Sequence, residues 1–141
     1  MQAASAVAAA LVFVWLGMVL AISFIETPLK FRAPGVTLQI GLGIGRLVFR
    51  ALNACELALA AVVVACFAVD APTRCVALAV AVAVVTLLAQ VLAVRPRLTR
   101  RSDTVLEGGE GPRSRAHWVY VGLEIVKVIA LLIAGVSLLA T

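Results

Sequence analysis

Four side chains that can carry charge or form hydrogen bonds lie within one apolar run of the sequence: His117, Tyr120, Glu124 and Lys127. Each residue of an α-helix turns the chain by about 100 degrees, so all four fall on one stripe of a helix. Ionisable groups are costly inside a bilayer, and those found there commonly bind or relay a charged species. The stripe therefore predicts a polar site within the membrane, provided that another helix supplies partners for it.

A second polar stripe recurs at steps of three and four residues, as expected for one helix face, and consists of Arg46, Arg50, Asn53 and Glu56. If both helices enter the membrane near Arg50 and His117, Glu56 and Glu124 lie at a similar depth. A rise of 1.5 Å per residue puts both roughly 10 Å inside the cytoplasmic boundary. We therefore expect the two stripes to face each other or a shared cavity.

The depth of Lys127 predicts how these charges pair. Lys127 lies one turn deeper than Glu124, so we expect it to pair with Glu56 and to leave Glu124 available to Arg46 or Arg50. Glu26, near the first membrane boundary, could join from the interface. Two interpretations stay open. The charges are either structural ion pairs that fix helix register, or a cytoplasm-facing site that binds or transports a small charged species.

A metal site is a third interpretation, in which one histidine and two or three carboxylates hold a divalent ion. Di-iron helical bundles use a Glu-x-x-His spacing, and neither Glu56 nor Glu124 has a histidine three residues on. We expect no catalytic residues, because no Ser, Cys or Thr stands in a recognisable nucleophile setting and His117 has no second histidine beside it. The three cysteines form no chelating pair and are typical of small buried apolar residues. No cofactor is assigned.

The composition predicts the scaffold. Apolar residues make up 64% of the 141 residues, against ~45–50% in ordinary soluble chains, so the surplus must face lipid. Apolar runs long enough to cross a bilayer predict an all-α, four-transmembrane-helix bundle. We expect one membrane domain over residues 1–141, with spans at about 3–25, 51–69, 75–94 and 117–140.

The connecting segments carry the remaining expectations. The amphipathic segment 36–50 is either an interfacial helix or an extension of the second span. Pro28 is expected to end the first span, because the residue before a proline disfavours helix. The third span has Gln90 as its one strongly polar side chain, so we expect it to contribute least to the chemistry. The polar segment 95–115 is expected to be a cytoplasmic loop.

The basic residues predict orientation and partners. They are concentrated in segments 26–50 and 95–115, whereas the opposite side of the predicted bundle holds only Arg74. The positive-inside rule then puts both loops in the cytoplasm and both termini outside a cell membrane. These cations flank apolar runs, so nucleic acid is not expected as a partner. Four spans leave little room for a pathway, so we expect a homo-oligomer or a subunit of a larger membrane complex. A non-catalytic accessory role in such a complex is the alternative function.

Several short motifs also carry a resemblance: Phe24-Ile25-Glu26-Thr27-Pro28-Leu29-Lys30-Phe31, Gly43-Ile44-Gly45-Arg46-Leu47-Val48-Phe49, Leu52-Asn53, Arg95-Pro96 with Arg100, and His117 with Tyr120. With them the chain resembles a family of small four-span membrane proteins of unknown function. That family is distantly similar to the copper-resistance D type and includes an animal member associated with cisplatin resistance. The resemblance implies a four-span fold with a histidine opening the last span. This sequence differs in carrying Glu26, Lys30, Glu124 and Lys127.

Overall fold

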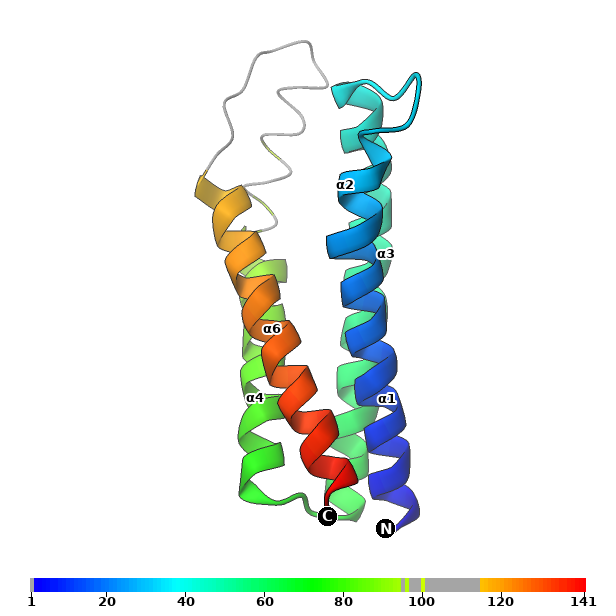
Figure 1. Ribbon diagram of the computed structural model, residues 1–141. Helices are drawn as coiled ribbons and strands as arrows, with labels where there is room; N and C mark the ends of the chain where they lie inside the picture. The colour runs from blue at the N-terminus through cyan, green and yellow to red at the C-terminus, as the bar shows by residue number, and fades with distance from the viewer. Residues whose placement is uncertain (1, 95, 97–99, 101–114) are drawn as a thin grey trace.

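The computed structural model describes residues 2–94, 96, 100 and 115–141. Within these residues the chain forms helices joined by short turns, and four of the helices are long and apolar enough to cross a membrane. Figure 1 shows the long helices running side by side, with both chain ends at one end of the bundle. The prediction of an all-α, four-helix membrane bundle is confirmed.

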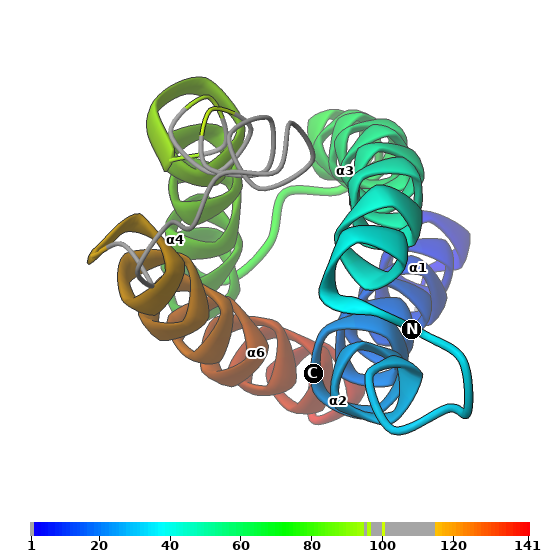
Figure 2. The ribbon, with the colours of Figure 1, turned by 90° about the horizontal axis from the view of Figure 1, so that it is seen from above.

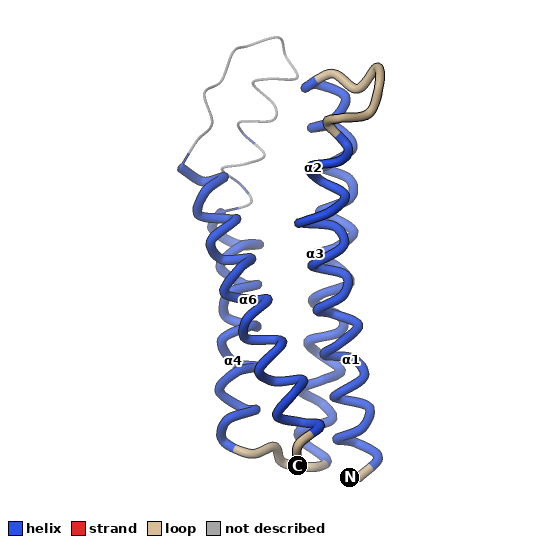
Figure 3. The backbone as a smooth tube through the Cα atoms, viewed as in Figure 1, coloured by secondary structure: helices blue, strands red, loops and turns tan. Residues whose placement is uncertain are grey.

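The first span is one continuous rod made of three segments. It begins with α1 (Ala3–Val19), continues through the π-helical segment η1 (Leu20–Glu26) and ends with α2 (Thr27–Lys30). The second span is α3 (Leu38–Val69). The backbone trace in Figure 3 shows how short the connections before and after α3 are.

The third and fourth spans complete the bundle. The third consists of α4 (Arg74–Ala89) and a second π-helical segment, η2 (Gln90–Val94), and the fourth is α6 (Arg115–Leu139). Both agree closely with the predicted spans 75–94 and 117–140. The predicted cytoplasmic loop 95–115 falls almost entirely outside the described residues.

The helices form an open ring when seen along the bundle axis. The first span packs against both α3 and α6, and α4 packs against α6. The contact between α3 and α4 is much smaller, and Figure 2 shows these two helices well separated toward the end that lies away from the termini. The chain alternates in direction from span to span, so α3 and α6 run parallel to each other.

The apolar core lies in the half of the bundle nearest the termini. It is built from small and β-branched side chains such as Ala8, Val12, Val63, Ala83 and Ala134. Within lipid, close packing rather than water exclusion holds helices together, and small residues allow their backbones to approach. A core of this composition therefore suits four helices that also face lipid.

The segment 36–50 is an extension of the second span rather than a separate surface helix. Helix α3 begins at Leu38, where the Thr37 hydroxyl accepts a hydrogen bond from the Ile40 amide at 3.2 Å, and continues without a break to Val69. The turn before α3 folds back onto the first residues of this helix. A Cβ atom on Gly41 would lie 2.2 Å from the Phe31 ring, so only glycine leaves room for the ring there.

The expectation that Pro28 ends the first span is wrong, because the helix continues to Lys30. The cause is the π-helical register before it. The Thr27 amide bonds to the Ile22 carbonyl, and the Thr27 hydroxyl donates to the same oxygen at 2.8 Å. Pro28 then occupies the first turn of α2, where a missing amide hydrogen is tolerated.

Candidate functional site

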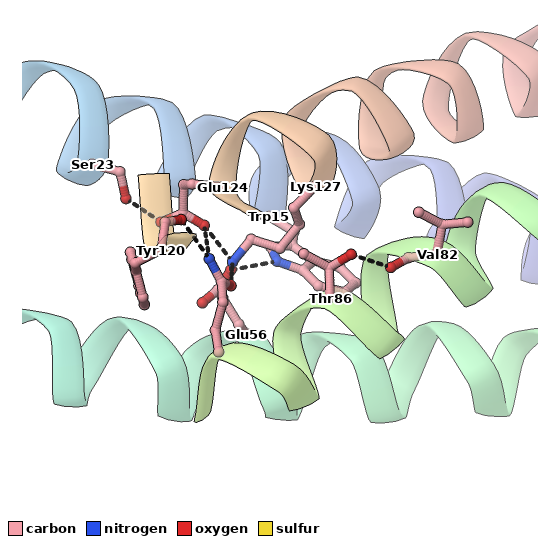
Figure 4. A network of polar contacts seen from close by, with 9 residues as sticks. Trp15, Ser23, Glu56, Val82, Thr86, Tyr120, Glu124 and Lys127 are labelled. Atoms are coloured by element: carbon pink, nitrogen blue, oxygen red, sulfur yellow. Dashed lines mark hydrogen bonds and ion pairs between the residues drawn. The ribbon is translucent and has the colours of Figure 1, made fainter. Parts of the chain in front are cut away.

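Lys127 lies at the centre of a buried polar cluster. Its side chain is 0% exposed, and its Nζ atom lies 2.5 Å from Glu56 Oε1, 2.6 Å from Glu124 Oε1 and 2.8 Å from Gln90 Oε1. An ammonium group has three hydrogens to donate, so each can be matched to one of these oxygens. Figure 4 shows the ammonium between the carboxylates of α3 and α6.

Further hydrogen bonds connect these acceptors to the remaining helices. The Trp15 indole donates to Glu56 Oε1 at 3.0 Å, and the Ser23 hydroxyl donates to Glu124 Oε2 at 2.5 Å. The Gln90 amide donates to Glu124 Oε1 at 3.2 Å and to the Tyr120 carbonyl at 3.4 Å. We call the connected side chains the polar network: Trp15, Ser23, Glu56, Gln90, Glu124 and Lys127. Every span of the described bundle contributes to it.

The parallel helices α3 and α6 explain why the carboxylates and the lysine meet. Phe49 and Tyr120 pack edge to face across these helices, with ring centroids 5.8 Å apart. Glu56 follows Phe49 by seven residues, and Lys127 follows Tyr120 by the same interval. Two full helical turns on parallel helices therefore lead from the aromatic pair to the ion pair.

Two π-helical segments hold the network residues Ser23 and Gln90, whereas Trp15 comes from α1. Ser23 lies within η1, and Gln90 is the first residue of η2. A π-helical turn holds an extra residue, which changes the direction of the side chains around it. Such turns often occur at functional sites. The hydroxyl of Thr86, one turn before Gln90, instead donates a hydrogen bond to the Val82 carbonyl oxygen at 2.6 Å.

The polar network lies between two apolar regions along the bundle axis. Toward the termini it borders the alanine-rich core. Toward the other end it borders Tyr120, packed with Phe49 and Leu123. Its members are therefore withdrawn from water on both sides, and interactions between charges there are stronger than at a surface.

The charges in the polar network do not balance. One ammonium faces two carboxylates, so full ionisation leaves one negative charge in excess. Glu56 Oε2 and Asn53 Oδ1 are buried oxygen atoms without a hydrogen-bond partner among the described residues. Both side chains belong to α3, three residues apart, and Asn53 is only 6% exposed. The two unsatisfied oxygens therefore lie on α3, the helix that supplies one of the two carboxylates facing Lys127.

The sequence predicted part of this arrangement. The expected pairing of Lys127 with Glu56 is present. The expectation that Glu124 is available to Arg46 or Arg50 is wrong, because Glu124 lies one turn from Lys127 on α6 and binds it directly. Both carboxylate oxygens of Glu124 are thus engaged within the network.

The other predicted residues lie nearer the end of the bundle that bears the 31–37 turn. Glu26 does not join the polar network. It faces Lys30 one turn on, at 3.7 Å, because both lie on the same face of the first span. Tyr120 contributes its backbone carbonyl and packs its ring on Phe49. His117 lies on α6, and its side chain is outside the part of the chain that the structure describes.

Three members of the polar network were not predicted from the sequence: Trp15, Ser23 and Gln90. Tryptophan in spans usually lies at the membrane interface, so its place near the middle of the first span was a usable signal for Trp15. The expectation that the third span contributes least is wrong, since Gln90 contacts Lys127, Glu124 and the Tyr120 backbone. An isolated polar residue in a span was the signal there.

Metal ligands are not gathered at this site in the described residues. Within 2–94, 96, 100 and 118–141, no three side chains of His, Cys, Asp or Glu lie close enough to hold a metal ion. The three cysteines are free thiols, of which Cys55 and Cys75 are exposed on the helix surfaces.

Comparison with models of known protein families, with characterised proteins and with solved structures gives no match to this chain. The resemblance to the four-span family of the copper-resistance D type stays a prediction from sequence motifs.

Proposed function

We propose that this protein binds or transports a small charged species at the polar network, and that the species is a cation. The observation that carries the proposal is the charge imbalance at a buried position. Lys127 faces both Glu56 and Glu124, and all three side chains are withdrawn from solvent. A bound positive charge removes the excess.

A purely structural role explains this composition less well. Holding helix register needs one cation for each anion, and even a balanced buried pair is often no more stable than apolar residues of the same size. A second carboxylate beside the same lysine adds the desolvation of another ion. Intramembrane ionisable groups are therefore interpreted first as functional, and this group has the additional feature of an unmatched charge. The proposal assigns no chemical conversion to the site.

We propose that the cation enters from the cytoplasm. Lys127 precedes Leu139, the last residue of α6, by twelve residues, which corresponds to about 18 Å of helix. A hydrocarbon core of about 30 Å then leaves roughly 12 Å to the other boundary. That nearer boundary is the one flanked by Lys30 and Arg32, which supports a cytoplasmic position for it and extracytoplasmic termini.

We also propose that the functional form is a homo-oligomer or a complex with another membrane protein. The open side between α3 and α4, where the two helices contact each other least, supports this arrangement. Light scattering on the protein in lipid nanodiscs measures its mass, and a monomer at every protein concentration would contradict homo-oligomerisation.

The function is tested by ion flux into proteoliposomes that contain the purified chain. Protons, Na⁺ and K⁺ are supplied separately as gradients, with protein-free vesicles as the background. We expect Glu56→Gln and Glu124→Gln to lower the flux of one ion at least tenfold, because each removes one negative charge at nearly unchanged size. Asp70→Asn is the matched control, since the Asp70 carboxylate accepts a hydrogen bond from the Ser5 hydroxyl at the end of the bundle that holds the termini, away from the polar network. Equal flux in wild type and both glutamate variants removes the proposal.

A further inference from the structure

We infer that the cation is a proton held on Glu56 Oε2, with the Asn53 side-chain oxygen as the acceptor of its hydrogen bond. The movement of that proton rests on the proposed function above, whereas its binding stands on the structure and is tested separately.

The distribution of hydrogen-bond donors assigns the proton to one oxygen atom. Glu56 Oε1 already receives Lys127 and Trp15, and Glu124 Oε1 receives Lys127 and Gln90. Glu124 Oε2 receives Ser23. Among the carboxylate oxygens of the polar network, Glu56 Oε2 is the one that meets no donor in the described chain, and it is fully buried. A proton there satisfies this atom and removes the excess charge in a single step.

Asn53 supplies the acceptor. Its Oδ1 atom is the other buried oxygen of this helix face without a partner in the described chain. Side chains three residues apart on a helix are neighbours, with Cβ atoms about 5–6 Å apart. Two carbonyl-type oxygens cannot hydrogen-bond to each other, because neither carries a hydrogen. A protonated carboxyl is a donor, so one proton on Glu56 satisfies both atoms.

A metal ion fits this position less well than a proton. Hard cations such as Ca²⁺ require about 6–8 oxygen ligands, and the described residues hold no group of acidic, histidine or cysteine side chains that could supply a metal site. The Lys127 ammonium, 2.5 Å from the other oxygen of the same carboxyl, would also repel a metal ion. A proton needs a single acceptor and adds no volume.

The groups that face Glu56 determine how readily it exchanges this proton. From α6, Lys127 favours the ionised carboxylate, whereas Glu124 disfavours it. Tyr120, also on α6, precedes Glu124 by four residues. The third span presents the neutral Gln90, and the first span presents Trp15 and Ser23, which are also neutral. Proton release to water leaves Glu56 ionised beside Lys127, and uptake restores the Asn53 hydrogen bond.

Infrared difference spectroscopy on the full chain in lipid nanodiscs tests the inference. We expect a carbonyl-stretch band of a protonated carboxyl at neutral pH that shifts in ²H₂O. The band should disappear in Glu56→Gln. In Glu124→Gln, which removes the excess charge, the band should appear only at a lower pH than in wild type. Asn53→Leu, which keeps the size but removes the acceptor, should move the band to higher frequency, and Asp70→Asn should leave it unchanged.

Each outcome decides between the proton and its alternatives. No carboxyl band at neutral pH, or a band that Glu124→Gln abolishes while Glu56→Gln leaves it, overturns the assignment. A band that Asn53→Leu does not move overturns the role of Asn53. If Glu56→Gln does not fold, the Asn53→Leu shift still identifies the carboxyl. Glu56-dependent Na⁺ or K⁺ flux without the band would contradict the protonation of Glu56 and support the proposed function. The band without any flux would support the protonation of Glu56 and contradict the proposed function.

Discussion

Lys127 shows how a lysine is retained inside a bilayer. Its ammonium has three oxygen acceptors, from Glu56, Gln90 and Glu124, all supplied by its own chain. Taking an ion out of water costs several kcal/mol, and good geometry with further hydrogen bonds is needed to offset that. Removing one partner therefore leaves the others uncompensated, which makes single substitutions here far more damaging than their size suggests.

Lys127→Met is expected to destabilise the bundle by about 3–5 kcal/mol, because the ionised Glu124 carboxylate then remains buried without its cation. Thermal unfolding followed by circular dichroism in detergent measures the change as a lower Tm. Ile129→Met is the control and should behave like wild type, because the Ile129 side chain is 53% exposed on the same helix. The double variant Lys127→Met with Glu124→Leu should recover part of the loss, since it removes the unmatched charge. A Tm equal to that of the control would contradict the ionic role of Lys127.

The Trp15 indole makes a different contribution, because it is a neutral donor to a carboxylate. Trp15→Phe keeps most of the ring but leaves Glu56 Oε1 with one donor fewer, so we expect a loss of about 1–3 kcal/mol in unfolding free energy. Trp118→Phe changes a side chain that is 60% exposed and should stay within about 0.5 kcal/mol of wild type. Chemical unfolding monitored by circular dichroism compares the two, and equal effects would show that the indole hydrogen bond adds nothing.

At the scale of the helices, periodicity predicted one half of the site and missed the other. The stripes on α3 and α6 follow a regular α-helical spacing, so Glu56 and Glu124 could be placed at one depth from the sequence and Lys127 one turn deeper. Ser23 and Gln90 could not, because they enter through η1 and η2, where an extra residue per turn breaks the 3.6-residue period. The prediction that Pro28 ends the first span was wrong for the same reason, because the segment before it is π-helical rather than α-helical.

Packing between the first span and α6 depends on a close approach at Gly135. A Cβ atom there would lie 2.7 Å from the Phe13 ring, which is closer than such atoms can approach. We expect Gly135→Ala to lower the unfolding free energy by about 1–3 kcal/mol, because the ring and the two helices must shift apart. Gly122 on the same helix has open space around it, so Gly122→Ala should be neutral or should stabilise by up to about 1 kcal/mol.

The comparison between these two glycines separates steric from backbone effects. Both substitutions add the same methyl group to the same helix, so any general change in helix propensity appears in both. Tm values from detergent-solubilised protein provide the comparison. If Gly135→Ala is as stable as Gly122→Ala, the contact with Phe13 does not limit the helix spacing.

At the scale of the whole molecule, the composition was sufficient to predict the fold but not to predict which helices pack against each other. The apolar content and the four runs predicted the bundle. Which helices touch could not be predicted, because spans of Ala, Val and Leu have little variation from face to face. The pairing of the first span with α3 and α6, and of α4 with α6, therefore had to come from three-dimensional packing. That packing is what brings Trp15 and Gln90 to the two predicted stripes.

The orientation of the bundle gives the last prediction. Cys75 is exposed beside the turn at the end of the bundle that holds both termini, whereas Ala33 is exposed in the turn at the other end. In a background of Cys55→Ala and Cys66→Ala, a membrane-impermeant maleimide should label Cys75 in intact cells, since we propose that this end is extracytoplasmic. With Cys75→Ala added, Ala33→Cys should react only after the cells are permeabilised. The reverse pattern would place the basic end outside, against the positive-inside rule, and would make the polar network accessible from the wrong side for cytoplasmic entry.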